Sequence, residues 1–498
     1  MPTLDADVCI IGAGAAGLVL AELLTLDAPT RVCIVESGPS SFADRDEPFE
    51  VRNTGKEHLG VNYGRVTAFG GTTNMWGGGL IRPSRTDFRP LDGRPETGWP
   101  IPFDEMLPHY EAIENLFEFS PDQGSTMFER DGVEVQRRDM PVLPFSKKNF
   151  GTTFGPGLRQ REHVTILCDA QTEAFVGDTT QGVREIRVKQ KDGTETLVRA
   201  ERFVVAAGIV GTNLLAKRLL NDLGAAADHD QHGRYVHDHL SFPLARLHPK
   251  KHYAFSRRFG YRFEGGMMYG EHFDLESTDR VGLGAFFHLA FDMSTSSLLN
   301  PVREIMNFIQ RGKFEEGALK PRDILGLLKG GPMLGITRYV HKRLYLDKGA
   351  TILAVLDLEQ MPDRRWALSE TDDGCDFEWG VSDEDTEQAA ALIPICWEIV
   401  ERLKGESDFD VEVLMPDPKE DPAGFRAYLE SDAADTYHAA GGFRMSAEEN
   451  APLDENLRLR DAPNVHLVST AVFPRVGSSN PTHTILALAH RLAEQIRA

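Results

Sequence analysis

Two short apolar runs flank an apolar stretch of helical spacing near the N-terminus. Residues 7–12 read Asp-Val-Cys-Ile-Ile-Gly and residues 31–36 read Arg-Val-Cys-Ile-Val-Glu, so each run is continuous and rich in β-branched side chains. Continuous runs of this kind are typical of strands that are buried on both faces of a parallel sheet. Between them, residues 18–26 carry apolar side chains at the period of a helix. The pattern predicts a strand, a helix and a second strand in that order.

Further along the chain, the same patterns predict strands over residues 165–168, 185–189 and 351–360. Residues 351–360 alternate between apolar and other side chains as a sheet strand does, and the two earlier runs are expected to join a small β-meander. Near the C-terminus, apolar residues recur at helical spacing up to Ile496. Pro481 suits the first turn of that helix, and Asn480 is placed to cap it.

The turn between the first strand and the first helix holds three glycines, Gly12, Gly14 and Gly17. Gly12 permits a tight turn, Gly14 lets backbone amides approach a pyrophosphate, and Gly17 lets the helix pack closely on the strand. The free N–H groups at the helix N-terminus attract phosphate charge. Glu36, at the end of the second run, can accept hydrogen bonds from ribose hydroxyls. The unit predicts dinucleotide binding, but this motif alone does not separate FAD from NAD.

The overall composition limits the classes of partner. The 498 residues include 41% hydrophobic and 26% charged side chains, which indicates a globular protein of two or three lobes. The 76 acidic and 54 basic residues leave a net charge of −22, which disfavours nucleic acid and anionic membrane surfaces as main partners. No run approaches the ~20 apolar residues of a membrane span, and no secretory signal is recognisable. With five scattered cysteines and no CxxC pair, we expect a cytoplasmic protein without a bound metal.

A second glycine cluster lies at residues 69–79, which read Phe-Gly-Gly-Thr-Thr-Asn-Met-Trp-Gly-Gly-Gly. So many glycines around one tryptophan indicate a loop whose backbone passes close to a flat ligand. Here the sequence resembles the glucose–methanol–choline (GMC) oxidoreductases, a family of FAD enzymes. The resemblance continues over residues 98–110, 203–215 and 233–239. Met75 stands where some pyranose oxidases carry the histidine that tethers flavin, so FAD is expected to bind without a covalent bond.

The resemblance implies a fold and a set of cofactor-binding residues. The fold is α/β, with a Rossmann-type FAD-binding domain built from discontinuous segments (1–100, 195–240 and 435–498) and an α+β substrate-binding domain with an antiparallel sheet. The substrate-binding lobe and its connecting segments take residues 101–194 and 241–434. The implied cofactor-binding residues are Gly12, Gly14, Ala15, Ala16, Gly17, Glu36, Ser37, Gly70, Gly71, Thr72, Asn74, Met75, Trp76, Gly77, Gly78, Ala207, Gly208, Ser469, Thr470, Asn480, Pro481 and Thr482.

Two C-terminal segments, residues 437–445 and 477–484, resemble the catalytic pair of the family. By this resemblance His438 is the catalytic base and Asn480 its partner. Oxidation of an alcohol removes a hydroxyl proton and transfers a hydride to flavin N5, and histidine suits the proton step because its pKa of ~6.5 lies near working pH. Asn480 does not titrate, but it can hydrogen-bond the alkoxide or the carbonyl oxygen. A capping role for Asn480 is the alternative, and the two roles are compatible.

The leading hypothesis is FAD-dependent oxidation of a sugar, polyol or similar hydrophilic alcohol, with oxygen or another electron acceptor. Two other hypotheses stay open. One is an FAD-containing lyase of the same fold that performs acid–base chemistry without electron transfer, and the other is a flavin-binding scaffold without catalysis. The sequence does not determine the oligomeric state.

Three features stand outside this pattern. His237 and His239 are spaced as a metal pair, but no third ligand clusters near them in the sequence, so a structural role is expected. His483 stands where the family usually has leucine, and packing within its helix is expected. The locally basic residues 300–348 mix glycine, proline and apolar side chains, which suits a lid, a partner-docking arm or a solvated helical face.

Overall fold

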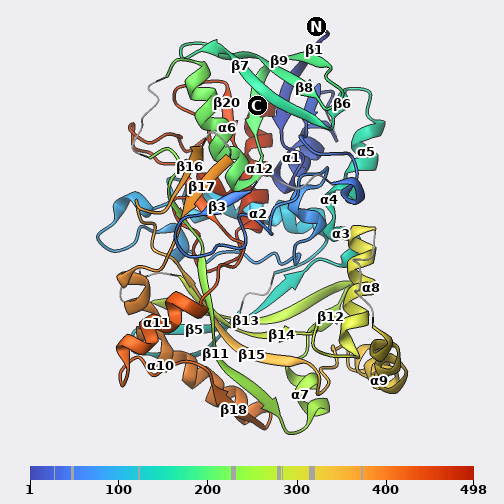
Figure 1. Cartoon of the computed structure of the whole chain (residues 1–498), viewed down its shortest axis with the longest axis vertical. Coiled ribbons are helices and arrows are strands. Elements are labelled where there is room, and N and C mark those ends of the chain that lie inside the picture. The colour runs from blue at the N-terminus through green and yellow to red at the C-terminus, as the bar shows by residue number, and fades with distance from the viewer. Residues whose placement is uncertain are drawn as a thin grey trace.

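The computed structural model describes residues 1–26, 28–45, 50–121, 124–225, 231–277, 282, 284–312, 320–371 and 374–498. Their strands form three sheets of seven, five and eight strands. The seven-stranded sheet lies at the end of the molecule that holds both termini, and the eight-stranded sheet lies at the opposite end (Figure 1).

The seven-stranded sheet has the order β6-β2-β1-β9-β8-β7, with β20 beside β9. The pairs β6–β2, β2–β1, β1–β9 and β9–β20 are parallel, whereas β7, β8 and β9 form an antiparallel meander. The strands are β1 (Thr3–Ile11), β2 (Val32–Val35), β6 (Val164–Leu167), β7 (Ala170–Asp178), β8 (Gly182–Gln190), β9 (Glu195–Val205) and β20 (Val465–Leu467).

Helices cover this sheet. α1 (Ala15–Thr25) follows β1 and packs against α12 (Thr482–Arg497), which also packs against α2 (Phe103–Phe117), while α6 (Gly208–Asp222) follows β9. All four residues of β2 are buried, as expected for a strand between two parallel neighbours. The strand–helix–strand unit predicted from residues 7–36 is confirmed.

The sheet also takes in β6, β7 and β8, so residues 164–190 share the sheet of the N-terminal unit. The division expected from the sequence differs here, because it places these residues in the substrate-binding lobe and its connecting segments (101–194). β6 is not part of the meander, because it pairs with β2 in parallel register from Val32 and Val164 onward. Without β6 the backbone N–H and C=O groups on that side of β2 would lack sheet partners.

A five-stranded sheet of order β19-β10-β16-β17-β3 lies in the middle of the molecule. Its strands come from distant parts of the chain, namely β3 (Val51–Asn53), β10 (Arg234–His237), β16 (Ala367–Thr371), β17 (Gly374–Glu378) and β19 (Ala440–Gly442). β10 is followed after one residue, Asp238, by β11 of the third sheet. This passage from one sheet to the next holds Asp238 between the two halves of the molecule.

The eight-stranded sheet is antiparallel, in the order β18-β11-β15-β14-β13-β5-β4, with β12 beside β13. The strands are β4 (Ser125–Arg130), β5 (Val133–Val142), β11 (His239–Pro249), β12 (Arg262–Glu264), β13 (Met267–Ser277), β14 (Ala285–Asp292), β15 (Thr351–Glu359) and β18 (Phe409–Val413). β15 confirms the strand predicted over residues 351–360.

Alternate residues of these strands build the second hydrophobic core. Leu356 and Leu358 of β15 are buried in it, together with Ile393 and Cys396 of α10 (Asp383–Glu406). The remaining helices of four residues or more are α3 (Phe145–Lys148), α4 (Phe150–Thr153), α5 (Gly155–Gln160), α7 (His252–Phe259), α8 (Leu299–Arg311), α9 (Pro321–Val340) and α11 (Pro422–Asp432). The opposite face of the sheet carries polar side chains, among them Ser241, His288 and Asp357. Among the described helices, none is both long and apolar enough to cross a membrane.

Candidate active site

The turn between β1 and α1 requires glycine at two positions. Gly12 has a φ of +108°, and a Cβ there would lie 2.5 Å from the carbonyl oxygen of Ala206. A Cβ on Gly17 would lie 2.1 Å from the carbonyl oxygen of Gly12, so any larger residue would push α1 off the strand. No side chain caps the N-terminus of α1 at Gly14, which leaves backbone N–H groups for an anionic ligand.

The tryptophan loop lies directly against this turn. The N–H of Gly70 donates to the carbonyl of Ala13 at 2.9 Å, and a Cβ on Gly71 would lie 2.9 Å from the Cα of Gly14. Gly70 and Gly71 both have positive φ, at +99° and +53°. The two glycine clusters begin at Gly12 and Gly70, about 58 residues apart in the sequence. Together they form one cradle in which added side chains would clash.

Two side chains of this loop are held by protein contacts. Asn74 is buried, and its amide donates to the carbonyl of Gly71 at 2.8 Å. The Nε1 of Trp76 donates to the carbonyl of Lys148 at 2.7 Å, while the Met75 side chain is exposed. Asn74 and Trp76 thus shape the loop through their side chains, and the contacts of this loop with the cofactor remain a prediction.

Four further predicted cofactor residues, Ala207, Gly208, Ser469 and Thr470, lie at the carboxyl ends of β9 and β20. Ala207 precedes α6 and Gly208 begins it with a φ of +68°. The N–H of Val468 donates to the carbonyl of Val205, which places Ser469 and Thr470 beside the end of β9. Parallel strands bind ligands at this edge, so the segments predicted from distant parts of the sequence do meet around one site.

Glu36 follows β2 and is buried. Its Oε2 accepts the N–H of Ala13 at 2.9 Å, and its Oε1 accepts the N–H of Gly38, beyond Ser37, also at 2.9 Å. Burial raises the pKa of Glu36 to about 7. The carboxyl group ties the glycine turn to the loop after β2, and a ribose contact at this position remains a prediction.

Glu36→Ala is expected to weaken FAD binding about tenfold or more, because a hydrogen bond to a charged group contributes about 1.5–3 kcal/mol. Titration of the apoprotein with FAD, followed by flavin fluorescence, measures the effect. Glu201→Ala alters an exposed position on β9 and is the control. Equal affinity of Glu36→Ala and the control would rule out the assignment.

His438 and Asn480, predicted as the catalytic pair, lie in contact. The Nδ2 of Asn480 donates to the Nε2 of His438 at 3.1 Å. The Oδ1 of Asn480 is buried and has no hydrogen-bond partner among the described residues. The residue before His438, Tyr437, has a φ of +65°, a strained conformation for a side chain of this size.

Hydrogen bonds determine which nitrogen of His438 carries the proton. Its Nδ1 lies 2.7 Å from the Oγ1 of Thr436, and that hydroxyl donates to the Oδ1 of Asp238 at 2.9 Å. The Nε2 of His239 donates to the carbonyl of Gly477 at 2.8 Å, so its Nδ1 has the lone pair that faces the Nδ1 of His438 at 3.2 Å. Both neighbours of the His438 Nδ1 are therefore acceptors. The proton lies on Nδ1, and Nε2 presents its lone pair.

Asp238 is the centre of this network. It is fully buried and accepts the backbone N–H groups of His239 at 2.6 Å and His438 at 2.9 Å. Burial acts to raise the pKa of Asp238, but His58, whose Nε2 lies 3.1 Å from Oδ2, and the neighbouring histidines outweigh it and hold the pKa below its ordinary value. Burial and then His239 lower the pKa of His438 to about 4. The site therefore combines a buried, ionised Asp238 with a neutral His438.

Asp238, Asp435, Thr436 and His58 belong to the network but are not among the residues predicted from the sequence. Thr436 and Asp435 stand within three residues of His438, so their position was a usable signal, and Asp435 accepts the N–H of Tyr437 at 3.1 Å. His58 lies in a stretch without any recognised motif. Only the packing of its loop against Asp238 reveals it, because the two residues are far apart in the sequence.

His239 lies close to Asp238 and His438, and the ligand atoms of the three residues lie within 4.8 Å of one another, a grouping that the sequence did not indicate. The chain brings them together through the β10–β11 passage and the loop before β19. Asn480 does not cap α12, because that helix begins at Thr482 after Pro481 and has no side-chain cap. His483 is fully buried against Tyr110, as expected of a packed helix residue.

A buried ion pair holds the loop that carries Asn480. Arg475 and Glu359 are both fully buried and share a bidentate pair, with Nε of Arg475 2.9 Å from Oε1 of Glu359. The same carboxylate accepts the N–H of Gly477 at 2.8 Å, and Asp87 accepts the N–H of Ser478 at 2.8 Å. The end of β15 therefore anchors residues 475–478 to the eight-stranded sheet.

The polar face of the eight-stranded sheet lies above the catalytic pair. Ser241 and Asp357 are cross-strand neighbours on the face that also carries His239. Burial acts to raise the pKa of Asp357, but His288, 3.4 Å away, and Ser241 outweigh it and lower the pKa. Asp357 in turn contributes to the electrostatic field at His438. The surroundings of the pair are therefore hydrophilic and charged.

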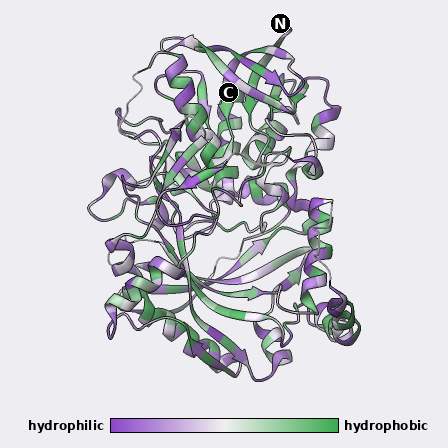
Figure 2. Ribbon diagram, in the orientation of Figure 1, coloured by the Kyte–Doolittle hydropathy of each residue, from purple (hydrophilic) through white to green (hydrophobic). Residues whose placement is uncertain are grey.

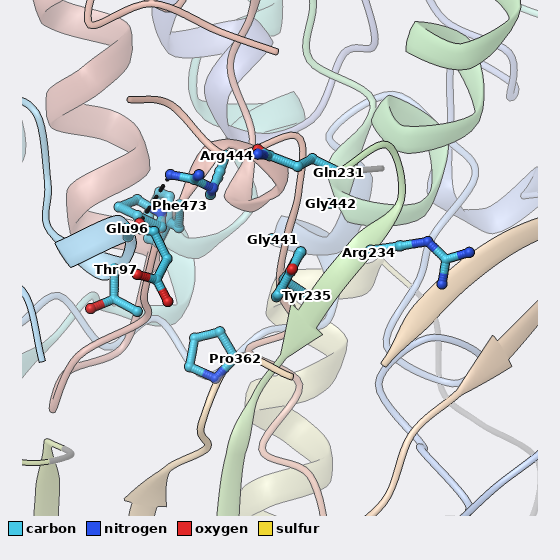
Figure 3. A pocket seen from close by; sticks show the side chains of 11 residues that line it. Glu96, Thr97, Gln231, Arg234, Tyr235, Pro362, Gly441, Gly442, Arg444 and Phe473 are labelled. Atoms are coloured by element: carbon cyan, nitrogen blue, oxygen red, sulfur yellow. Dashed lines mark hydrogen bonds between the residues drawn. The ribbon is translucent and has the colours of Figure 1, made fainter. Parts of the chain in front are cut away.

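A small cavity of about 50 Å³ lies beside the segment that follows His438 (Figure 3). Across it, Arg444 donates to the carbonyl of Glu96 at 3.0 Å. The cavity is too small for a cofactor, and none of the predicted FAD-binding residues lines it. It is lined by Glu96, Thr97, Gln231, Arg234, Tyr235, Pro362, Gly441, Gly442, Arg444, Phe473 and Pro474.

Comparison with known proteins bears on both the fold and the family. Residues 367–489 match the family model described as GMC oxidoreductase. The fold is similar to pyridoxine 4-oxidase from Mesorbium loti, with a TM-score of 0.60 and 15% identity over 98% of this chain and 99% of that one. It is also similar to formate oxidase, with a TM-score of 0.62 and 15% identity over 100% and 99% of the two chains. A variant of the Aspergillus oryzae RIB40 formate oxidase gives a TM-score of 0.61 at 12% identity over 99% and 98%. None of the curated proteins matches by sequence.

The family match and the fold together define an oxidoreductase with an α/β nucleotide-binding domain and a second, antiparallel domain. Residues 367–489 thus match the GMC oxidoreductase family model, and the whole chain has the fold of the two solved oxidases. The cofactor of this family is FAD. A bound dinucleotide fits the glycine cradle, where added side chains would clash, and the N-terminus of α1, which no side chain caps.

Proposed function

We propose that this protein oxidises a hydrophilic alcohol, of the sugar or polyol class, to a carbonyl compound, with His438 as the base. The observation that carries the proposal is the hydrogen-bond network that keeps the proton of His438 on Nδ1 and leaves the Nε2 lone pair for a substrate hydroxyl. A histidine in this state is ready to accept a proton.

Each residue of the site has a separate role in the proposed reaction. Bound FAD would be held by the glycine turn, Glu36 and the tryptophan loop, and it supplies the hydride acceptor for the alcohol carbon. His438 takes the hydroxyl proton at Nε2, and the positive charge that develops on its ring is compensated by Asp238 through the Thr436 hydroxyl. For this transfer Asn480 first turns its Nδ2 hydrogen bond from His438 to the substrate oxygen, which frees the Nε2 lone pair. Thr436, Asp238 and His239 act as positioning residues.

The polarity of the site supports a hydrophilic substrate. Asp357, His288 and Ser241 offer hydrogen-bonding groups on the sheet face above His438, and the unpartnered Oδ1 of Asn480 offers an acceptor. An alkyl chain placed there would leave these groups without partners, whereas the further hydroxyls of a sugar or polyol would satisfy them. We propose that this difference selects the substrate.

The test is anaerobic addition of sugars and polyols, and of unbranched alkanols of matching chain length, to the holoprotein. The flavin absorbance is expected to bleach with the hydrophilic series and to persist with the alkanols. Bleaching by the alkanols alone would overturn the substrate class. Persistent colour with every alcohol would overturn the redox proposal and favour a lyase or a scaffold. Readmission of oxygen then distinguishes an oxidase from a dehydrogenase, because only an oxidase regains its colour rapidly.

A further inference from the structure

The outward face of α9 is apolar. α9, which is described over its whole length, packs inward through small residues: a Cβ on Gly326 would lie 2.3 Å from the carbonyl oxygen of Ser297, and one on Gly330 would lie 2.6 Å from the Leu298 side chain. Since its inner face lies this close to the chain before α8, only the opposite face is open to a partner.

That opposite face carries large apolar side chains. Leu328 is 74% exposed and Tyr339 is 82% exposed. Ile324, Leu325, Ile336 and Val340 are exposed beside them. α9 lies at the margin of the molecule, at the end away from both termini, and Figure 2 shows its hydrophobic colouring. A surface helix ordinarily turns polar residues outward, so this arrangement indicates a surface that is covered in use.

The charges around α9 are opposite in sign to those of the whole chain. Residues 320–343 contain six lysines and arginines and a single acidic residue, Asp323, in a protein of net charge −22. Asp323 is buried and its Oδ2 accepts the N–H of Lys320 at 2.9 Å, so it does not face outward. Lys320, Lys329 and Lys342 are exposed along the helix and its ends.

We propose that α9 docks the protein on an anionic lipid surface. A helix with an exposed apolar face and flanking lysines lies in the plane of such a surface, with its apolar side chains among the headgroups and its cations on the lipid charges. A twofold contact with a second copy would bury the same apolar face but would bring the two sets of lysines together. The charge pattern therefore favours lipid. This inference does not depend on the proposed alcohol oxidation.

The test is sedimentation of the full-length holoprotein with vesicles of phosphatidylcholine and phosphatidylserine in equal parts, and with vesicles of phosphatidylcholine alone. Binding is expected only to the anionic vesicles, and it should weaken as salt is added. The double variant Leu328→Glu/Tyr339→Glu should bind at least about tenfold less, since it removes two apolar anchors and adds two negative charges. Val413→Glu, at an exposed apolar position on β18, is the matched control and should bind as the parent does. Unchanged flavin absorbance and melting temperature verify that the variants are folded.

Three outcomes overturn the proposal. One is a parent protein that stays in the supernatant with the anionic vesicles. Another is a parent protein that is dimeric by light scattering and becomes monomeric in Leu328→Glu/Tyr339→Glu, because α9 is then a contact between two copies of the chain. Equal loss of binding in the Val413→Glu control would also remove the special role of α9.

Discussion

His438→Gln is expected to reduce the rate of alcohol-dependent flavin reduction by about 10²- to 10⁴-fold, the usual contribution of a positioned general base. The glutamine keeps a polar side chain beside Asn480 but offers no basic nitrogen at the position of Nε2. Since His438 contacts no residue of the glycine cradle in the described network, FAD should remain bound and the protein should stay yellow. Stopped-flow measurement of flavin absorbance without oxygen gives the rate directly.

The pH profile separates a base from a merely structural residue. A base works in its unprotonated form, and the pKa of His438 is lowered to about 4, so the parent rate should hold through neutral pH and fall as the pH drops through about 4. His438→Gln should lack that limb. His248→Gln, at an exposed position of β11, is the matched control and should leave rate and profile unchanged. If the rate of His438→Gln still falls as the pH drops through about 4, another residue accepts the proton.

Glu359→Gln is expected to destabilise the protein by about 3–5 kcal/mol, because it leaves the guanidinium of Arg475 buried without its counterion. Arg475 is fully buried, and the substitution also weakens the acceptor of the Gly477 N–H. Thermal unfolding of the holoprotein should therefore begin at a clearly lower temperature. The loop before Asn480 should loosen as well, which would slow the reduction by alcohol.

The comparison with a surface pair gives the control. Asp376→Asn removes the partner of Arg52, whose side chain is 71% exposed, and should cost at most about 1 kcal/mol. Burial acts to raise the pKa of Glu359, but Arg475 outweighs it and lowers the pKa. The ion pair therefore stabilises the fold at pH values above the ordinary pKa of glutamate, and this stabilisation is lost as the pH falls below that pKa. Glu359→Gln should lack this acid-side loss. Equal melting temperatures for Glu359→Gln and Asp376→Asn would contradict the anchoring role.

The sequence by itself determined the features that depend on neighbouring residues. The glycines at 12, 14 and 17 between two apolar runs predicted the first turn, and the structure gives Gly12 the positive φ that such a turn needs. Alternating side chains predicted β15 almost to the residue. Backbone conformation and strand period are properties of a few consecutive residues, so local patterns carry them. The resemblance of residues 437–445 and 477–484 to one family also brought His438 and Asn480 forward as a pair.

Only the tertiary structure decided which groups surround that pair and what they do. His58, Asp238 and His438 come from three distant segments, and nothing in their local sequences indicates that one carboxylate touches both histidines. The helix pattern favoured Asn480 as a cap, but its amide faces His438 because Glu359 and Arg475 hold the preceding loop on another sheet. Likewise, the sequence left a lid, a partner-docking arm and a solvated face open for residues 300–348, and only the structure shows that most of the large apolar side chains of α9 are exposed. The neighbours of His438 and Asn480 and the exposure of α9 depend on contacts between residues that lie far apart in the sequence. The order of the strands in the sheets determines those contacts.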